Sequence, residues 1–291
     1  MAWRDYLLNA FSGADDGIPP WVAEFADGDD EGYFGDGSAV WAVNGATPVL
    51  VAGIRALLMQ TLHPGAMAGV HDWSRYREDP LGRLAGTVRW VMTTTFDDRA
   101  GAEAGSAFVR SLHTRVTGTY TDAAGATVPY SAGDPALLSW VHVVFAESFL
   151  SCHQALAGEI PGGPDAYVRE WSAAGDLMGV AAPPRSEREL RDQLAAFGPS
   201  LVADERVAEA VRFIRNPPLA RSVMPGYRIL FAGALSTIEP QYLRMLGLRR
   251  PWWPARSATR AVLFVLALVL GRPSESEKHA RKRLGRLVRS A

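Results

Sequence analysis

The hydrophobic positions of the chain recur mainly with the period of an α-helix, and short stretches rich in glycine, proline and acidic residues interrupt them. Residues 79–118 predict two helices joined by a short acidic turn. The first begins after Asp79 and Pro80, a capping residue followed by a proline that suits a first helical turn. The second is expected over about 102–117, ending at Gly118.

One apolar stripe runs along the second of these helices, with the i, i+3, i+4, i+7 spacing of a buried face. Its members are Phe108, Val109, Leu112, His113 and Val116. His113 is therefore expected to point inward. The first helix carries Arg83 and Thr87 four positions apart, which places both side chains on one face.

Further helices are expected before and after this pair. An apolar helix over 47–62 stops at His63, because the proline that follows disfavours helical geometry in the residue before it. Its inner face is expected to comprise Leu50, Ile54, Leu57, Leu58 and Thr61. A short helix over 66–71 follows, and 119–133 predicts a small hairpin or an ordered loop.

Asp134 and Pro135 repeat the cap-plus-proline pattern and begin a long helix. One side of this helix is expected to comprise Leu138, Val141, His142, Phe145, Phe149 and Cys152, with Trp140 and Glu147 elsewhere. His142 is the polar residue on that apolar stripe. Later helices are expected over 167–180, 187–197, 203–215 and 225–247, with a capping serine at Ser186 and a kink or break at Pro240.

Composition limits the class of protein. The 291 residues, of which 48% are hydrophobic and 21% charged, suit a globular chain that buries a full core. The formal net charge of −1 gives no global attraction to nucleic acid. A single cysteine and the lack of a signal-peptide pattern in the first residues predict a cytoplasmic location, with or without peripheral membrane association.

Three regions are expected: an N-terminal arm over 1–37, a helical domain over 38–250, and an apolar helix with a basic tail over 251–291. In the last region the apolar run 261–271 is too short to span a bilayer. The first interpretation is a core helix followed by a solvated charged tail. The alternative is a membrane-surface element, in which neighbouring tryptophans meet the interface and the Lys/Arg cluster attracts anionic headgroups.

Histidine and arginine supply the candidate chemistry, because no G-x-S-x-G elbow, P-loop, G-x-G-x-x-G turn, H-E-x-x-H helix or C-x-x-C pair is present. His113 has two interpretations: a buried neutral imidazole with backbone or water partners, or an axial ligand of haem iron. Spacing alone does not decide between them. His63, at a helix end, either interacts with the last helical carbonyls or belongs to a pocket.

Four blocks of the chain form a combined pattern: LLMQTLHPGAMAGV (57–70), YREDPLGRLAGTVRWV (76–91), VRSLHTRVTG (109–118) and YSAGDPALLSWVHVVFAESFL (130–150). In this order the blocks resemble the oxygenase MpaB family, whose domain is shared with the rubber oxygenases called latex-clearing proteins. The resemblance covers about residues 40–240. It implies an all-α fold, a single globin-like helical domain around a buried pocket for haem b.

The resemblance also implies site residues. The family's Arg-x-x-x-Thr pair corresponds to Arg83 and Thr87, and its axial histidine to His113, which would be the iron ligand. His142 is the rival ligand and would otherwise line the pocket, and His63 is expected to hydrogen-bond a ligand on the distal side of the iron. The rubber oxygenases also use a lysine beside the arginine, whereas residues 84–86 here read Leu-Ala-Gly. This difference argues against rubber as the substrate.

The expected function is a haem b-dependent oxygenase that acts with dioxygen on an apolar, isoprenoid or unsaturated lipid-like small molecule. Arg83, Thr87 and His63 would serve catalysis, while His113, Arg83, Thr87 and His142 would hold the haem. Two other interpretations stay open. One is a haem- or lipid-binding protein without turnover, and the other is a helical domain whose buried histidines and arginine form a polar network without a cofactor.

Overall fold

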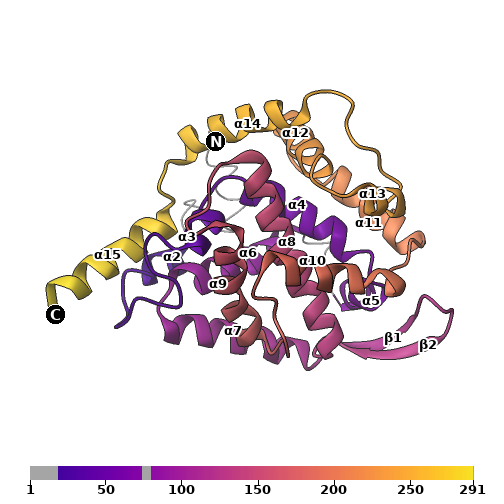
Figure 1. Cartoon of the computed structure of the whole chain (residues 1–291), viewed down its shortest axis with the longest axis horizontal. Helices are drawn as coiled ribbons and strands as arrows, with labels where there is room; N and C mark the ends of the chain where they lie inside the picture. Colours follow the sequence, from indigo (N-terminus) through magenta and orange to yellow (C-terminus); the bar gives the residue numbers. More distant parts are fainter. Residues whose placement is uncertain (1–18, 74–79, 291) are drawn as a thin grey trace.

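A computed structural model of the chain describes residues 19–73 and 80–290. Within these residues the structure is helical apart from one two-stranded hairpin, which confirms the all-α expectation (Figure 1). Helix α8 runs through the middle of the molecule, with the hairpin at one end and the C-terminal helix at the other. The expected cap Asp79 lies outside the described residues, as do the side chain of Arg83 and residues 1–18 of the N-terminal arm.

The elements follow one another along the chain with short connections. Before the hairpin come α2 (Pro20–Glu24), α3 (Ala39–Asn44), α4 (Val49–Gln60), α5 (Pro64–Trp73), α6 (Pro80–Phe96) and α7 (Arg99–His113). The hairpin consists of β1 (Thr117–Thr121) and β2 (Thr127–Ser131), which pair antiparallel. After it come α8 (Pro135–Leu156), α9 (Gly163–Met178), α10 (Glu187–Ala196), the short turn η1 (Gly198–Ser200), α11 (Glu205–Arg215), α12 (Met224–Leu235), α13 (Pro240–Met245), α14 (Ala255–Leu270) and α15 (Glu275–Ser290).

Several local signals in the sequence are confirmed. Helices begin at Pro80 and Pro135 as expected, and the Ser186 hydroxyl accepts a hydrogen bond from the Glu189 amide at 3.2 Å, as a helix cap does. Pro240 begins a new helix, so the expected break in 225–247 is present.

The expected bounds of α7 are wrong at both ends. The helix begins at Arg99, because the Asp98 carboxylate caps it by accepting the Gly101 amide at 2.7 Å. It ends at His113, and Gly118 is a strand residue rather than a helix cap. The Tyr130 ring lies directly against Gly118, where a Cβ atom would come within 2.9 Å of the ring, so glycine permits this close strand pairing.

The expected apolar stripe of α7 is only partly correct. Val109 and His113 are half-buried on the inner face, which begins with the fully buried Ala102 and Ser106. Phe108 and Leu112, by contrast, are 64% and 44% exposed. Small residues, which let α6 approach closely, define the inner face of this helix, so the large apolar side chains could not identify it.

Helix α8 is buried on nearly every side, contrary to the expected single apolar face. Trp140 and Glu147, assigned elsewhere from the sequence, are buried, while Val141 is exposed. The reason is that α4, α9 and α10 pack around α8 from different directions. By length and hydropathy alone α8 could span a membrane, yet 61% of its most apolar window is buried inside the protein. The expected inner face of α4 is correct at Ile54 and Leu58 but not at the exposed Leu57.

The basic C-terminal segment is a helix packed on the body, not a solvated tail. Arg283 of α15 is fully buried and donates hydrogen bonds to the carbonyls of Phe25 at 2.8 Å and Phe96 at 2.9 Å. Its guanidinium also lies 3.7 Å from the Asp97 carboxylate. One arginine therefore connects α15 to the end of α6 and to the segment that follows α2.

Arg283→Ala should lower the free energy of unfolding by about 3 kcal/mol, because two carbonyls and a carboxylate lose a buried partner. Lys282→Ala is the matched control, since Lys282 is the exposed neighbour on the same helix. Urea unfolding followed by circular dichroism measures both. Equal stabilities of the two variants would contradict this role of Arg283.

Candidate functional site

Two contacts fix how α6 and α7 lie against each other. The Trp90 indole donates to the Ser106 hydroxyl at 3.1 Å. One turn away, a Cβ atom on Gly105 would lie 3.3 Å from the Thr93 side chain, so the helices touch closely there. The two helices run antiparallel, joined at Asp97, and these contacts set their register.

The register brings the predicted site positions of α6 to the level of His113 on α7. Arg83 precedes Trp90 by seven residues, which is about two turns, and His113 follows Ser106 by the same interval. The backbone of Arg83 therefore lies at the level of His113 on the neighbouring helix. Thr87, half-buried and one turn closer to Trp90, lies at the level of Val109 by the same reasoning.

The hairpin of α6 and α7 is held against α8 and α9. The Trp90 ring packs edge-on against Trp171 of α9, with centroids 6.1 Å apart, and against Phe145 of α8 at 6.5 Å. At the other end, the Arg110 guanidinium donates to the Leu177 carbonyl near the end of α9. The half-buried His113, whose Nδ1 atom is buried, is one turn beyond Arg110 on α7.

His142 is buried in α8 against the backbone of α9. A Cβ atom on Gly175 would lie 2.9 Å from Cε1 and 3.1 Å from Nε2 of the imidazole, so only glycine permits this approach. Burial lowers the pKa of His142 to about 4, and its ring is neutral at physiological pH. The α9 backbone at Gly175 therefore lies close to the Cε1–Nε2 side of the ring.

His63 lies in a different environment, between the end of α4 and the start of α5. Its ring is surrounded by Trp140, Phe197 and Tyr120, with centroids 5.9, 6.1 and 6.3 Å away. The Gly65 amide donates to Nδ1 at 3.2 Å, so in the neutral ring the proton is on Nε2. Burial lowers the pKa of His63 to about 4. His63 also lines a cavity of about 380 Å³, together with Phe197 and residues of the β-hairpin.

The structure does not bring His63 and His142 into one site. His63 packs on Trp140, and Trp140 precedes His142 by two residues, a rotation of about 200° around α8. The two histidines therefore lie on opposite faces of that helix. His142 is on the α9 side, to which the hairpin of α6 and α7 is also attached.

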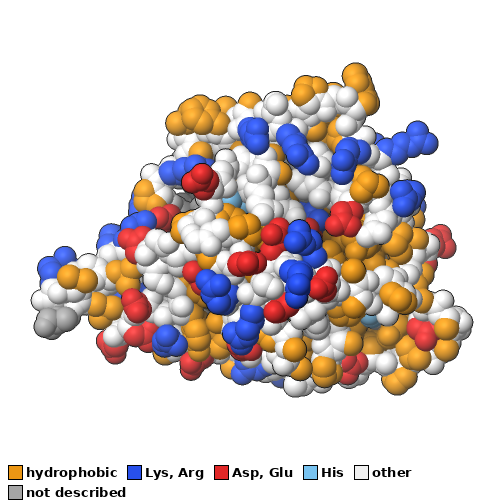
Figure 2. Space-filling view, viewed as in Figure 1, with side chains coloured by type: hydrophobic (Ala, Val, Ile, Leu, Met, Phe, Trp, Pro, Cys, Tyr) orange, Lys and Arg blue, Asp and Glu red, His pale blue; other side chains and the backbone are white. Residues whose placement is uncertain are grey.

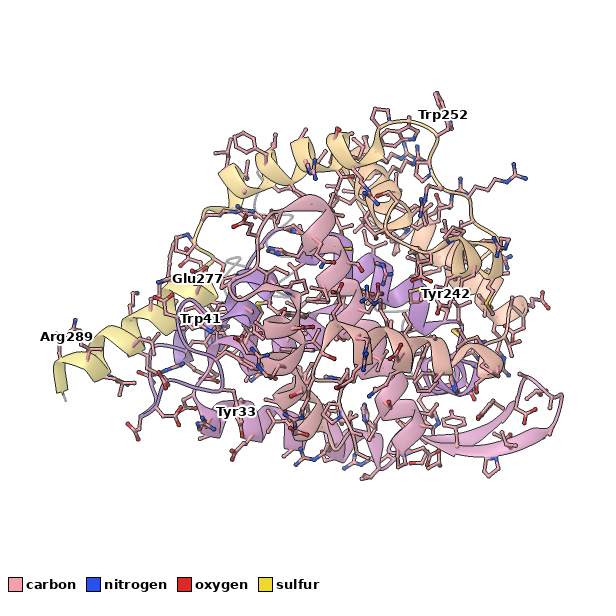
Figure 3. All side chains as sticks on the ribbon, in the orientation of Figure 1. Tyr33, Trp41, Tyr242, Trp252, Glu277 and Arg289 are labelled. Atoms are coloured by element: carbon pink, nitrogen blue, oxygen red, sulfur yellow. The ribbon has the colours of Figure 1, made fainter. Side chains whose placement is uncertain are left out.

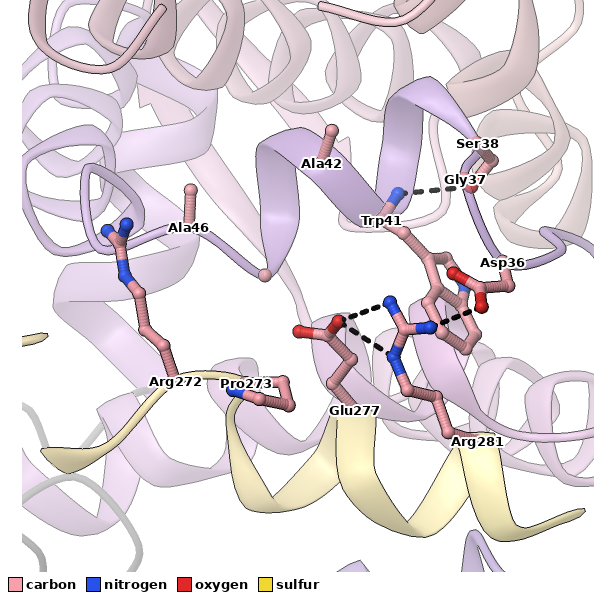
Figure 4. A pocket seen from close by; sticks show the side chains of 11 residues that line it. Asp36, Gly37, Ser38, Trp41, Ala42, Ala46, Arg272, Pro273, Glu277 and Arg281 are labelled. Atoms are coloured by element: carbon pink, nitrogen blue, oxygen red, sulfur yellow. Dashed lines mark hydrogen bonds and ion pairs between the residues drawn. The ribbon is translucent and has the colours of Figure 1, made fainter.

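A larger cavity, of about 610 Å³, opens between α3 and α15 (Figure 4). The Arg281 guanidinium lies over the Trp41 ring, 5.7 Å from its centroid, and bonds to Glu277 and Asp36. Arg281 therefore links α15 to the segment before α3, while Arg272 on the other side of the cavity donates to the Thr47 hydroxyl at 2.6 Å. Of the predicted site residues whose side chains the structure describes, His63, Thr87, His113 and His142, none lines it.

A family model of the catalytic domain of "ER-bound oxygenase mpaB/B'/Rubber oxygenase" matches residues 41–272. The chain belongs to this family. No curated protein and no solved structure gives a significant match. The matched range contains α4 to α14 and most of α3, and with them His63, His113, His142 and the hairpin of α6 and α7.

Membership in the oxygenase family confirms the suspected resemblance and fits a small-molecule substrate and dioxygen. "ER-bound" in the family description refers to mpaB, and the cytoplasmic location expected for this chain stays a prediction. Haem and iron binding also stay predictions. Among the residues that the structure describes, no three His, Cys, Asp or Glu side chains gather as a metal site.

Sequence reasoning missed a buried ion pair between α4 and α8. The Arg55 guanidinium of α4 donates to both carboxylate oxygens of Glu147 on α8 and to the Ser148 hydroxyl, the latter at 2.8 Å. Both charged residues are buried. A signal was present, because each is a single charge of opposite sign in an otherwise apolar helix.

Acidification should destabilise the protein through its buried histidines. The two histidines concerned are His63 and His142. In the unfolded chain their imidazoles bind protons near pH 6.5, whereas in the folded chain their pKa is about 4. The unfolded state therefore binds more protons, and the free energy of unfolding falls between about pH 6.5 and pH 4, by up to about 3 kcal/mol for each histidine. Asp97 opposes part of this loss, because burial raises its pKa to about 6.

Urea unfolding across this pH range measures the effect in the wild type and in His142→Gln. The glutamine does not titrate, so the variant should lose less stability on acidification. Asp97→Asn is the control with the opposite expected effect. It should lose more stability than wild type on acidification, because the raised pKa of Asp97 no longer opposes the loss. Identical pH slopes for wild type and His142→Gln would contradict a buried, neutral His142.

Proposed function

We propose that this protein is a haem b-dependent oxygenase that acts with dioxygen on an apolar, isoprenoid or unsaturated lipid-like small molecule. The observation that carries the proposal is the register of α6 and α7, which sets Arg83 and His113 at one level within a domain of the oxygenase family. The substrate class follows from the sequence resemblance, and rubber is not proposed because the lysine of the rubber oxygenases is missing.

The residues at this level of the hairpin fit a haem by their chemistry. Haem iron takes an imidazole ligand, and a haem propionate is well matched by the forked donors of a guanidinium. His113 on the inner face of α7 and Arg83 on α6 provide these two groups. Half-buried Leu84, Val88 and Val109 supply apolar surface between them. When bound, the haem supplies the chemistry of dioxygen activation.

The roles of the side chains follow from their positions. His113 would hold the iron, and Arg83 would bind a propionate or orient the oxygen substrate through charge-assisted hydrogen bonds. Thr87, one turn along α6, would offer its hydroxyl at the edge of the haem. His142 would form part of the pocket wall as a neutral ring, because the approach of α9 to Nε2 favours His113 as the ligand.

A catalytic role of His63 at the same iron has less support. His63 packs on the face of α8 opposite His142, and it lines a separate cavity near the β-hairpin. We therefore assign the oxygen chemistry to the side of α8 that faces α9. His63 would contribute to it only indirectly, through its packing on Trp140.

The cofactor assignment is tested by ultraviolet–visible spectra of protein expressed with a haem supply. Wild type should show a Soret band with resolved bands after reduction. His113→Ala should lose the haem while keeping its helical circular dichroism, because the only proposed protein ligand is gone. His71→Ala is the matched control, since His71 on α5 pairs with Asp72 at the surface and should retain the haem.

An unchanged spectrum of His113→Ala together with haem loss in His142→Ala would show that His142 of α8, and not His113, is the iron ligand. A colourless wild type that also refuses added haem would contradict the cofactor.

Arg83→Lys tests the guanidinium separately from its charge. The lysine keeps the charge but loses the fork, so haem retention or dioxygen-dependent conversion of squalene should fall by about tenfold or more. Arg89→Lys on the exposed side of the same helix is the control and should behave as wild type. Haem retention without product in the wild type would support a binding protein without turnover.

A further inference from the structure

Helix α14 exposes an apolar face that the protein itself does not cover. Its inner side packs on α12, where the buried Thr259 hydroxyl donates to the Ile229 carbonyl at 3.1 Å and lies against Gly233. The opposite side carries the α14 stripe, which we define as Ala261, Phe264, Val265 and Leu268. Phe264 is 65% and Leu268 68% exposed. These positions have the i, i+3, i+4, i+7 spacing of one helix face.

A tryptophan extends this apolar surface toward the N-terminal side of α14. Trp252 is 96% exposed in the connection that precedes the helix. Figure 3 shows its side chain pointing away from the body, on the same outer edge of the molecule as α14. In Figure 2 hydrophobic side chains project along that edge, and Lys and Arg side chains lie directly beneath them.

The segment that carries the stripe has charges of one sign. Residues 240–274 contain six arginines and no aspartate or glutamate, although the whole chain has a net charge of −1. The arginines are Arg244, Arg249, Arg250, Arg256, Arg260 and Arg272, and all are exposed. Arg256 and Arg260 donate to the carbonyls of Ser236 and Ala155, so their charge is not neutralised by a carboxylate. Within the described residues none of the six forms an ion pair.

We infer that the α14 stripe and Trp252 form a docking surface for an anionic phospholipid membrane. A helix of this kind lies in the plane of the interface, with its apolar face about 5–10 Å deep and its basic residues at the headgroups. Tryptophan is favoured at the same depth, because its ring is apolar and its indole N–H is polar. The 56° bend between α14 and α15 directs the chain away from this plane.

The one-sided charge decides between a membrane and a second copy of the chain. A symmetric dimer through the α14 stripe would bring arginines of two chains together without acidic partners, at an electrostatic cost. An anionic lipid surface instead supplies the acidic partners that these arginines lack among the described residues. This inference does not depend on the proposed oxygenase activity, since none of the residues involved belongs to the candidate site.

Co-sedimentation of the full chain with phospholipid vesicles tests the inference. Wild type should bind vesicles of phosphatidylcholine with phosphatidylglycerol, more weakly at high salt, and bind phosphatidylcholine alone poorly. Phe264→Gln with Leu268→Gln should lower the partition coefficient by about tenfold or more, because two large apolar side chains are removed from the interface. Phe108→Gln is the matched control, since Phe108 has a similar exposure on α7.

The arginines are tested by Arg244→Gln with Arg249→Gln, which should weaken binding to the anionic vesicles by about fivefold per arginine. Arg188→Gln with Arg212→Gln removes the same charge from α10 and α11 and should have no effect. Circular dichroism checks that each variant is folded.

Wild-type binding by the folded Phe264→Gln, Leu268→Gln variant would overturn the inference. So would light scattering that shows this variant to be monomeric and the wild type dimeric, with equal vesicle binding by both, because a second copy would then cover the stripe.

Discussion

The ion pair between Arg55 and Glu147 joins the two central helices of the protein, α4 and α8. Removing two such charges from water costs several kcal/mol per ion, and this cost is offset only when the geometry is good and the remaining donors and acceptors have partners. Here the contact is bidentate, Ser148 accepts a further bond, and the Ser151 hydroxyl donates to Glu147 at 2.6 Å. A rotation of α8 would leave buried charges unpaired.

The orientation of α8 determines which residues can share a site. With Glu147 directed toward α4, Trp140 lies against His63 and the end of α4, where its indole donates to the Gln60 carbonyl at 3.3 Å. His142 is turned toward α9 and Gly175. The aromatic contacts of Trp90 then attach the hairpin of α6 and α7 to that same side. The separation of the His63 cavity from the proposed haem site thus follows from the pairing of α4 with α8.

Local signals in the sequence predicted much of this fold, but tertiary packing decided what they could not. Cap residues and prolines identified where α6, α8 and α10 begin, because these signals act within one turn. The faces of α7 and α8 were less predictable. Small residues such as Ser106 make the close contacts of α7, and α8 is surrounded by other helices, so its buried positions have no single period. Arg55 was overlooked because buried charge opposes the usual burial pattern.

The candidate site was predictable in its residue types and only partly in its arrangement. Arg83 and His113 were proposed from the resemblance, and their common level depends on the Trp90–Ser106 contact, which no sequence pattern indicates. From the sequence His63 was expected on the distal side of the iron and His142 as the rival ligand, so both were expected at one site. His63 packs on Trp140, which is two residues before His142 on α8. Two residues correspond to a rotation of about 200°, so the two histidines lie on opposite faces of α8.

The proposed haem site on the hairpin of α6 and α7 is tested most directly by chemical rescue of His113→Gly. Removing the side chain should abolish haem binding, and imidazole added in solution should restore both the Soret band and dioxygen-dependent conversion of squalene, because it replaces the missing ligand in the cavity. Haem retention without imidazole, or a rescue that occurs for His142→Gly and not for His113→Gly, would contradict a site built on this hairpin.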